Sequence, residues 1–165
     1  MKRLILITAL FALPLGLLLG CGQGDSANTL QARIDTLKTA QADAYVPGTG
    51  EIMNNIVQPH HYKLWLAGRN HNWQLAKYES HLLLGGFKRI QKYHHGTPEA
   101  NATPMIYPQI AAVENAIKQK DAEKFNQSYS ILTSVCNTCH QATGYKFNVI
   151  TVPKDGQGSY ADQAF

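Results

Sequence analysis

The chain has 165 residues, with 15 Lys or Arg against 11 Asp or Glu and a formal net charge of +4. Two of the positive charges, Lys2 and Arg3, precede an apolar leader, so the charge falls from +4 to +2 when they are removed. This length fits one domain, and the weak, scattered charge predicts no nucleic-acid surface.

Residues 1–20 have the pattern of an export signal. Lys2 and Arg3 are followed by an almost unbroken apolar run at 4–19 and then by small residues. The run is too short, and has the wrong flanks, for a membrane span. We therefore expect residues 1–20 to be a signal peptide that is removed from the mature protein.

The end of this signal, Leu-Leu-Gly-Cys at 18–21, resembles the lipobox of bacterial lipoproteins. The resemblance implies cleavage before Cys21, a diacylglycerol on its thiol, and a lipid-anchored protein in the bacterial periplasm. Gly22 in second place favours the outer membrane over the inner one. Ordinary signal cleavage, with Cys21 as an unmodified thiol, is the alternative.

The mature chain is expected to start with a tether and one separate helix. Residues 21–28 are small and polar, which is typical of a flexible tether. Leu30, Ile34 and Leu37 then recur at helical spacing, and this pattern predicts an N-terminal helix at 29–45.

The region 48–152 reads as an all-α domain. Apolar periodicity predicts helices at 51–67, 73–93 and 107–118, with a Pro- and Asn-containing crossover at 99–108. Two local features stand out inside these helices. Pro59 should kink the first one or start it anew. Gly85-Gly86 is costly in a helix interior and indicates the close approach of a neighbour.

The last helix carries the most informative pattern. Asp121 is a candidate N-cap, and the buried stripe that follows runs into Cys136, Cys139 and His140. Gly144 is a natural C-cap. Beyond it, an extended segment ending before Pro153 is expected to return across the site, and residues 153–165 form a loose tail. The stripe consists of Phe125, Tyr129, Leu132, Cys136, Cys139 and His140.

The pentapeptide Cys136-Asn137-Thr138-Cys139-His140 predicts covalent attachment of one haem c. Two thiols three positions apart on a helix share a face, so both can reach the two vinyl groups along one porphyrin edge. His140 is then carried under the ring as the proximal iron ligand. Three alternatives stay open: a thioredoxin-like redox pair, a zinc site and a short disulfide.

The cysteine count agrees with export and haem attachment together. The sequence has three cysteines, and an unpaired thiol is an awkward state in an oxidising compartment. Assigning Cys21 to lipid and Cys136 and Cys139 to haem leaves none over.

With several long helices and a late C-x-x-C-H, the chain resembles cytochrome c′, an up-down-up-down four-helix bundle. The match rests on Cys136, Cys139 and His140 and spans roughly 48–144. It implies an antiparallel four-helix bundle with an additional N-terminal helix here, and an option for homodimers through the first two bundle helices. The segments 61–65 and 72–76 also resemble a group of exported haem proteins, from which no function follows.

The other axial position of the iron decides the function. By analogy with cytochrome c′ it faces the first bundle helix, where His61 is the favoured distal residue or ligand, with Met53 and His60 as alternatives. A surface or core-edge role for His61 is the competing interpretation. Tyr78, Tyr129 and Tyr145 are candidates to hydrogen-bond a haem propionate, and the adjacent His pairs at 60–61 and 94–95 are poor metal sites because neighbouring helical residues diverge.

These expectations favour a lipid-anchored periplasmic cytochrome that transfers single electrons between partner proteins whose identity the sequence does not give. The alternative is a five-coordinate haem protein that binds nitric oxide or carbon monoxide. An enzyme such as a peroxidase would need a distal acid–base pair. The sequence supplies only His61 for that pair, so we expect no catalytic activity.

Overall fold

The computed structural model describes residues 26–42 and 44–154, which divide into one unit up to Tyr45 and a second from Val46 onward. All regular secondary structure in these ranges is helical, with no β-strand, so the predicted all-α class is confirmed. The predicted signal peptide at 1–20, Cys21, most of the predicted tether and the predicted tail beyond residue 154 lie outside the described residues.

The first unit contains α1 (Ala27–Ala42), which confirms a helix where residues 29–45 predict one. It begins earlier than predicted, because the Ser26 side chain accepts a hydrogen bond from the Thr29 N–H, 3.3 Å. None of its side chains is buried. Helix α1 is the one element in the described part of this unit, so its apolar stripe has nothing there to pack against.

The second unit starts with one continuous helical stretch of three parts. These are α2 (Thr49–Ile52), the π-helical turn η1 (Met53–Val57) and α3 (Gln58–Arg69). Pro59 stands at the start of α3, directly after the π turn. Proline has no N–H to donate within a helix. The predicted disturbance at Pro59 therefore takes the form of a π turn inside an unbroken helix.

The remaining helices follow through short connections. They are α4 (Trp73–Tyr93), α5 (Pro98–Ala102), the 3₁₀ turn η2 (Thr103–Ile106), α6 (Tyr107–Gln119) and α7 (Ala122–Ala142). The predicted cap of the last helix is confirmed, since Asp121 accepts from the Lys124 N–H. At the start of α4, Asn72 accepts from the Leu75 N–H in the same way.

Helix α5 lies largely within the crossover predicted at 99–108, where no helix was predicted. Thr97 caps its N-terminus by accepting from the Ala100 N–H, and Pro98 occupies the first helical turn. Both are regular helix-start signals. They outweigh the later Pro104, which is accommodated in the 3₁₀ turn.

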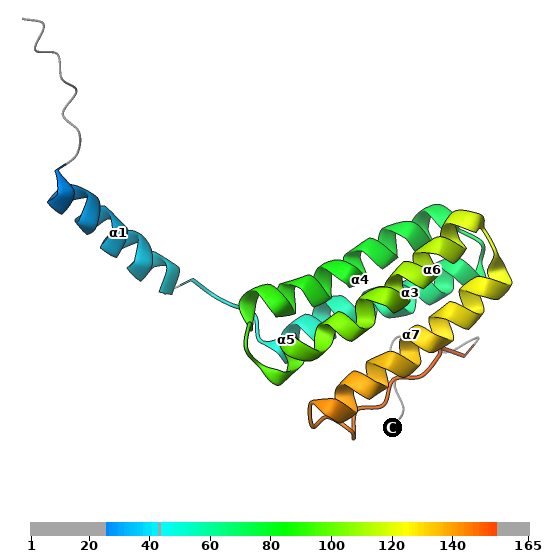
Figure 1. Cartoon of the computed structure of the whole chain (residues 1–165). Helices are drawn as coiled ribbons and strands as arrows, with labels where there is room; N and C mark the ends of the chain where they lie inside the picture. The colour runs from blue at the N-terminus through cyan, green and yellow to red at the C-terminus, as the bar shows by residue number, and fades with distance from the viewer. Residues whose placement is uncertain (1–25, 43, 155–165) are drawn as a thin grey trace, which may run out of the picture. The chain divides into compact units, whose positions relative to one another are not determined.

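The four long helices of the second unit lie side by side (Figure 1). Each of α3, α4, α6 and α7 contacts two of the others, in the order α3–α4, α4–α6, α6–α7 and α7–α3. Their inward faces form a single apolar core in which Leu64, Val113 and Phe125 are fully buried. None of the helices in the described ranges has the length and apolarity that a membrane span requires.

Candidate functional site

The two cysteines and the histidine of the pentapeptide border one cavity of about 300 Å³. They lie in the last two turns of α7, where Cys139 is buried and Cys136 and His140 are half-buried. No disulfide joins the two cysteines. The cavity opens where the predicted buried stripe of α7 changes from large aromatic residues to cysteines.

The opposite wall of the cavity carries Met53, Val57 and His61 from η1 and α3. In a regular α-helix, residues eight apart are rotated by about 80°. A π turn closes its hydrogen bond over five residues instead of four, so four of its residues fall short of a full turn. Four α-helical residues, in contrast, overshoot a full turn by about 40°. The π turn therefore brings these three side chains onto one face.

Helix α4 approaches this wall closely at Gly86. A Cβ atom there would lie 2.8 Å from Val57 Cγ2 and 3.2 Å from Ile56 Cγ2. The predicted close approach is thus found at Gly86, whereas a Cβ at Gly85 would meet nothing within 4 Å. Phe87 of α4 also lines the cavity.

The His140 ring is held in one orientation by the backbone. Its Nδ1 lies 2.6 Å from the Asn148 carbonyl oxygen. A carbonyl only accepts hydrogen bonds, so Nδ1 must carry the proton and Nε2 keeps its lone pair. A histidine that ligates a metal is typically oriented in this way by a second group.

The Asn148 carbonyl belongs to a segment at 145–153, here called the C-terminal strap, which follows α7 and lines the cavity with Tyr145, Asn148 and Ile150. The Asn137 amide nitrogen donates to the Ile150 carbonyl and its oxygen accepts from the Ile150 N–H, both at 2.8 Å. An extended segment was predicted in this region. The structure has no strand there, but Ile150 is an isolated β-bridge residue, and the Asn137 side chain adds these two hydrogen bonds to its backbone.

His61, the favoured distal residue, lines the cavity but is engaged elsewhere. The Thr133 hydroxyl donates to the Tyr129 carbonyl, 3.0 Å, so it can only accept from His61 Nε2, 3.1 Å away. The Tyr129 hydroxyl lies 3.0 Å from His61 Nδ1 and 2.9 Å from the His61 carbonyl oxygen, which share its one proton, and the two rings stack with centroids 4.7 Å apart. Both ring nitrogens of His61 therefore already have partners on α7.

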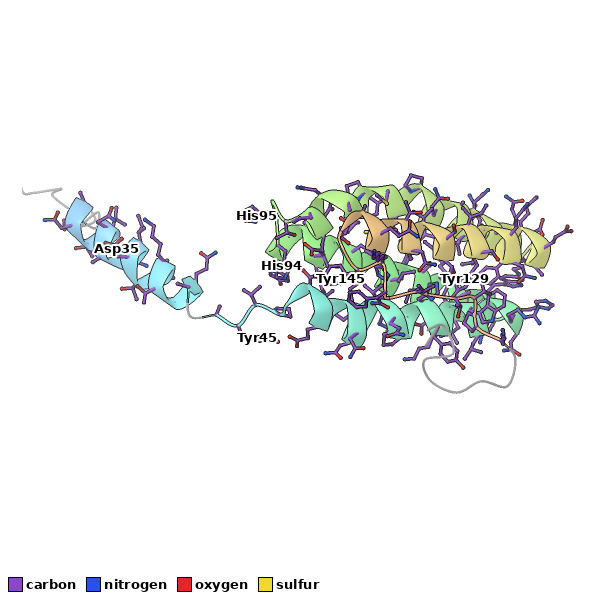
Figure 2. The ribbon with its side chains drawn as sticks, turned by 90° about the horizontal axis from the view of Figure 1, so that it is seen from below. Asp35, Tyr45, His94, His95, Tyr129 and Tyr145 are labelled. Carbon is purple, nitrogen blue, oxygen red and sulfur yellow. The ribbon has the colours of Figure 1, made fainter. Side chains whose placement is uncertain are left out.

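His60, one of the alternatives, does not line the cavity. Its Nδ1 forms a 2.6 Å hydrogen bond with Glu79 Oε2 of α4. His94 and His95 lie together at one end of the second unit (Figure 2), where His94 contacts the Pro47 carbonyl, 2.8 Å. Within 26–42 and 44–154, no group of three or more His, Cys, Asp or Glu residues is placed to hold a metal ion.

Glu99 and Tyr145 supply polar groups to the cavity lining. The Tyr145 hydroxyl donates to Glu99 Oε1, 3.2 Å, and this bond raises the tyrosine pKa. A backbone N–H hydrogen bond in the first turn of α5 lowers the pKa of Glu99. Burial raises the pKa of the Cys139 thiol, and the Glu99 charge raises it further. Of the three tyrosines proposed for a propionate, only Tyr145 lines the cavity.

The donor set fits a covalently attached haem better than the alternatives. Two thiols and an imidazole with Nε2 available share one cavity with apolar Val57 and Phe87. A thioredoxin-like pair stands at a helix N-terminus after a strand, whereas Cys136 lies inside α7 and the described chain has no strand. A tetrahedral zinc site needs further ligands, and the described residues offer no such cluster.

Two features of this site have no signature in the sequence. The Asn148 carbonyl is a backbone group, so any residue could supply it. The π turn is hinted at only by Pro59, which indicates that the helix is disturbed but not in which direction. Comparison of the chain with protein-family models, with curated proteins and with solved structures gives no match.

Proposed function

We propose that the chain is a c-type cytochrome that binds one haem c through thioethers to Cys136 and Cys139, with His140 as the proximal iron ligand. The single observation that carries this is the shared cavity of about 300 Å³, bordered by both thiols and by an imidazole whose Nδ1 is tied to a carbonyl. A haem takes four iron ligands from its macrocycle, so one oriented imidazole from the protein is enough to complete the proximal side.

We further propose that α3, α4, α6 and α7 form an antiparallel four-helix bundle of the cytochrome c′ type. The cyclic order of their contacts and their short connections support this arrangement. In such bundles, cofactor sites lie in the core between facing helices, which agrees with a cavity lined by α7 on one side and by η1 and α3 on the other.

The proposed activity is the transfer of single electrons between protein partners. Bound haem supplies a one-electron iron couple, and a second axial ligand favours electron transfer. Met53 is a sulfur-containing side chain on the wall that faces α7. A thioether keeps its lone pairs at any pH, whereas His61 would have to give up a buried hydrogen bond to bind iron.

Binding of nitric oxide or carbon monoxide to five-coordinate iron is the second candidate function. The engagement of both His61 nitrogens favours it, because Val57, Phe87 and Ile106 otherwise make this part of the cavity apolar. In either case we propose an exported protein, anchored in the periplasm by lipid on Cys21 at the outer membrane. We propose no catalytic activity and no nucleic-acid partner.

The test is the visible absorption spectrum of exported, purified protein, oxidised and reduced, with and without carbon monoxide. We expect a thioether-linked haem spectrum that survives acid–acetone extraction, and loss of this chromophore in a Cys136→Ala, Cys139→Ala double variant. Wild-type protein without a chromophore would contradict the proposal.

Two matched variants separate the candidate functions. If Met53 ligates the iron, Met53→Leu converts a low-spin spectrum to high-spin and opens the site to carbon monoxide, while His61→Leu leaves the spin state unchanged. A wild-type protein that is high-spin and shifts on adding carbon monoxide supports gas binding instead.

A further inference from the structure

We propose that Asn137, the first variable residue of the C-x-x-C-H pentapeptide, is a positioning residue that clamps the C-terminal strap so that the Asn148 carbonyl holds His140 in its ligating orientation. This inference rests on the proposed function and adds a residue that controls the proximal ligand.

The first step in the argument is the arrangement on α7. Asn137 and His140 are three residues apart, so their side chains stand on the same side of the helix, one turn from each other. Both contact the strap, Asn137 at Ile150 and His140 at Asn148. The strap therefore runs antiparallel to α7, and its two attachment points match the two helix positions.

The second step is the completeness of the clamp. Asn137 uses both ends of its amide on one residue, accepting from the Ile150 N–H and donating to the Ile150 carbonyl. This is the pattern by which an extended chain pairs with a neighbouring strand. An aspartate lacks the donor, and an alanine lacks both groups.

The third step is register. In an extended chain, residues two apart present their backbone groups to the same edge, and a slip by one residue presents the opposite edge. Asn148 and Ile150 are two apart, so fixing Ile150 on Asn137 also turns the Asn148 carbonyl toward α7. Without the clamp, a slip of residues 148–150 by one position would turn the Asn148 carbonyl away from α7, and the His140 Nδ1 proton would lose its acceptor.

The strap is also attached at its two ends. The Tyr145 N–H donates to the His140 carbonyl, 2.7 Å, next to Gly144 at φ +90°. At the far end, Val152 packs against the core and Pro153 is buried. Between these points, the Asn137 contact is the one that fixes the backbone of Ile150 on both its N–H and its carbonyl.

The neighbouring Thr138 provides a matched control. It is the other variable residue of the pentapeptide, it is exposed, and its hydroxyl donates to the Ser134 carbonyl of its own helix, 3.2 Å. Replacing it changes the pentapeptide without touching the strap.

The experiment compares wild-type, Asn137→Ala and Thr138→Ala holoprotein in three measurements. Haem content is taken from the pyridine haemochrome, the reduction potential from an equilibrium dye titration, and the protection of the Ile150 amide from hydrogen exchange. In Asn137→Ala we expect the Ile150 amide to exchange about tenfold faster, as for the loss of a hydrogen bond. We also expect a more positive potential, because a proximal imidazole without its acceptor is a weaker donor to ferric iron. Thr138→Ala should match wild type in both.

Each outcome is decisive. Haem-loaded Asn137→Ala with wild-type potential and wild-type Ile150 exchange overturns the inference. If Asn137→Ala does not acquire haem, Ile150→Pro takes its place. This variant lacks the Ile150 N–H that donates to the Asn137 side chain, while α7 keeps its sequence. An unchanged reduction potential in Ile150→Pro overturns the inference equally. If wild-type protein binds no haem, the proposed function fails, and Ile150 exchange in the haem-free full chain still tests the clamp alone.

Discussion

Helix α7 passes through two different environments. In its closed half, residues 122–133, Phe125, Tyr129 and Leu132 are each 0% exposed. The Phe125 ring stacks with Trp65, and the Tyr129 ring packs against Trp65 in a tilted arrangement. In its cavity half, residues 134–142, the same buried stripe continues as Cys136 and Cys139 beside about 300 Å³ of space. The same face of α7 therefore borders a filled core along its first half and the cavity along its second half.

The difference lies in side-chain volume and in hydrogen bonding. Large rings fill the space between α7 and α3 in the closed half, and they carry a satisfied polar network through His61 and Thr133. No buried side-chain nitrogen or oxygen in the described ranges lacks a hydrogen-bond partner. In the cavity half, small thiols replace the rings. The space beside them has the volume of a small-molecule pocket.

The largest loss of stability is expected when a buried ring of the closed half is removed. Phe125→Ala removes a fully buried ring in contact with Trp65, Trp73 and Tyr129, and should cost about 3–5 kcal/mol of unfolding free energy. Urea denaturation gives this value. The control is Ile131→Ala on the same helix, where the side chain is 49% exposed and a change within about 0.5 kcal/mol is expected. Equal losses in the two variants would contradict a filled core.

A pair of glycine variants compares the two halves directly. A Cβ at Gly68 would lie 2.1 Å from the Phe125 ring, in the closed half, so Gly68→Ala should cost about 1–3 kcal/mol. Gly86→Ala presses on Val57, which borders the cavity and has room to move, so its cost in the haem-free full chain should be smaller. Gly85→Ala meets nothing within 4 Å and should stabilise by about 0.5–1 kcal/mol. Urea midpoints rank the three, and a larger loss at Gly86 than at Gly68 would reverse the comparison.

The smallest effect on stability is expected at Asp121, the N-cap at the start of the closed half. The Lys124 N–H hydrogen bond lowers the pKa of Asp121 in the folded chain below its unfolded value of about 3.9. The stabilisation from this carboxylate is therefore complete above that value and is lost as the pH falls through the folded pKa. Asp121→Asn keeps a capping side chain but cannot titrate. Between pH 6 and pH 3, its urea midpoint should fall less than that of wild type, and identical slopes would count against the cap.

The sequence was informative where a local rule decides the structure. The helix at 73–93 has the bounds of α4, because Asn72 supplies its cap and a helix end follows at the paired histidines. The pentapeptide on the buried stripe of the last helix is found where the periodicity of Phe125, Tyr129 and Leu132 requires it. Whether the pentapeptide binds haem stays a prediction.

The rest depends on contacts between distant segments. The pairing of Asn137 with Ile150 joins residues whose types have no mutual preference, and the hydrogen bonds of His61 to Thr133 and Tyr129 cross from α3 to α7. Local periodicity does not contain such pairings. Helix α5 is different, because Thr97 and Pro98 are recognisable start signals that two later prolines concealed.

The π turn at Met53–Val57 has a consequence for reading related sequences. A π turn accommodates one residue more than the regular helix around it would hold. A homologue with an unbroken α-helix at this point would align with the present chain only through a one-residue gap between Met53 and Val57. Deleting Asn55 would convert one form into the other and would leave Thr49 and Gly50 close to their present place at the rim of the cavity, because the π turn already absorbs the extra residue.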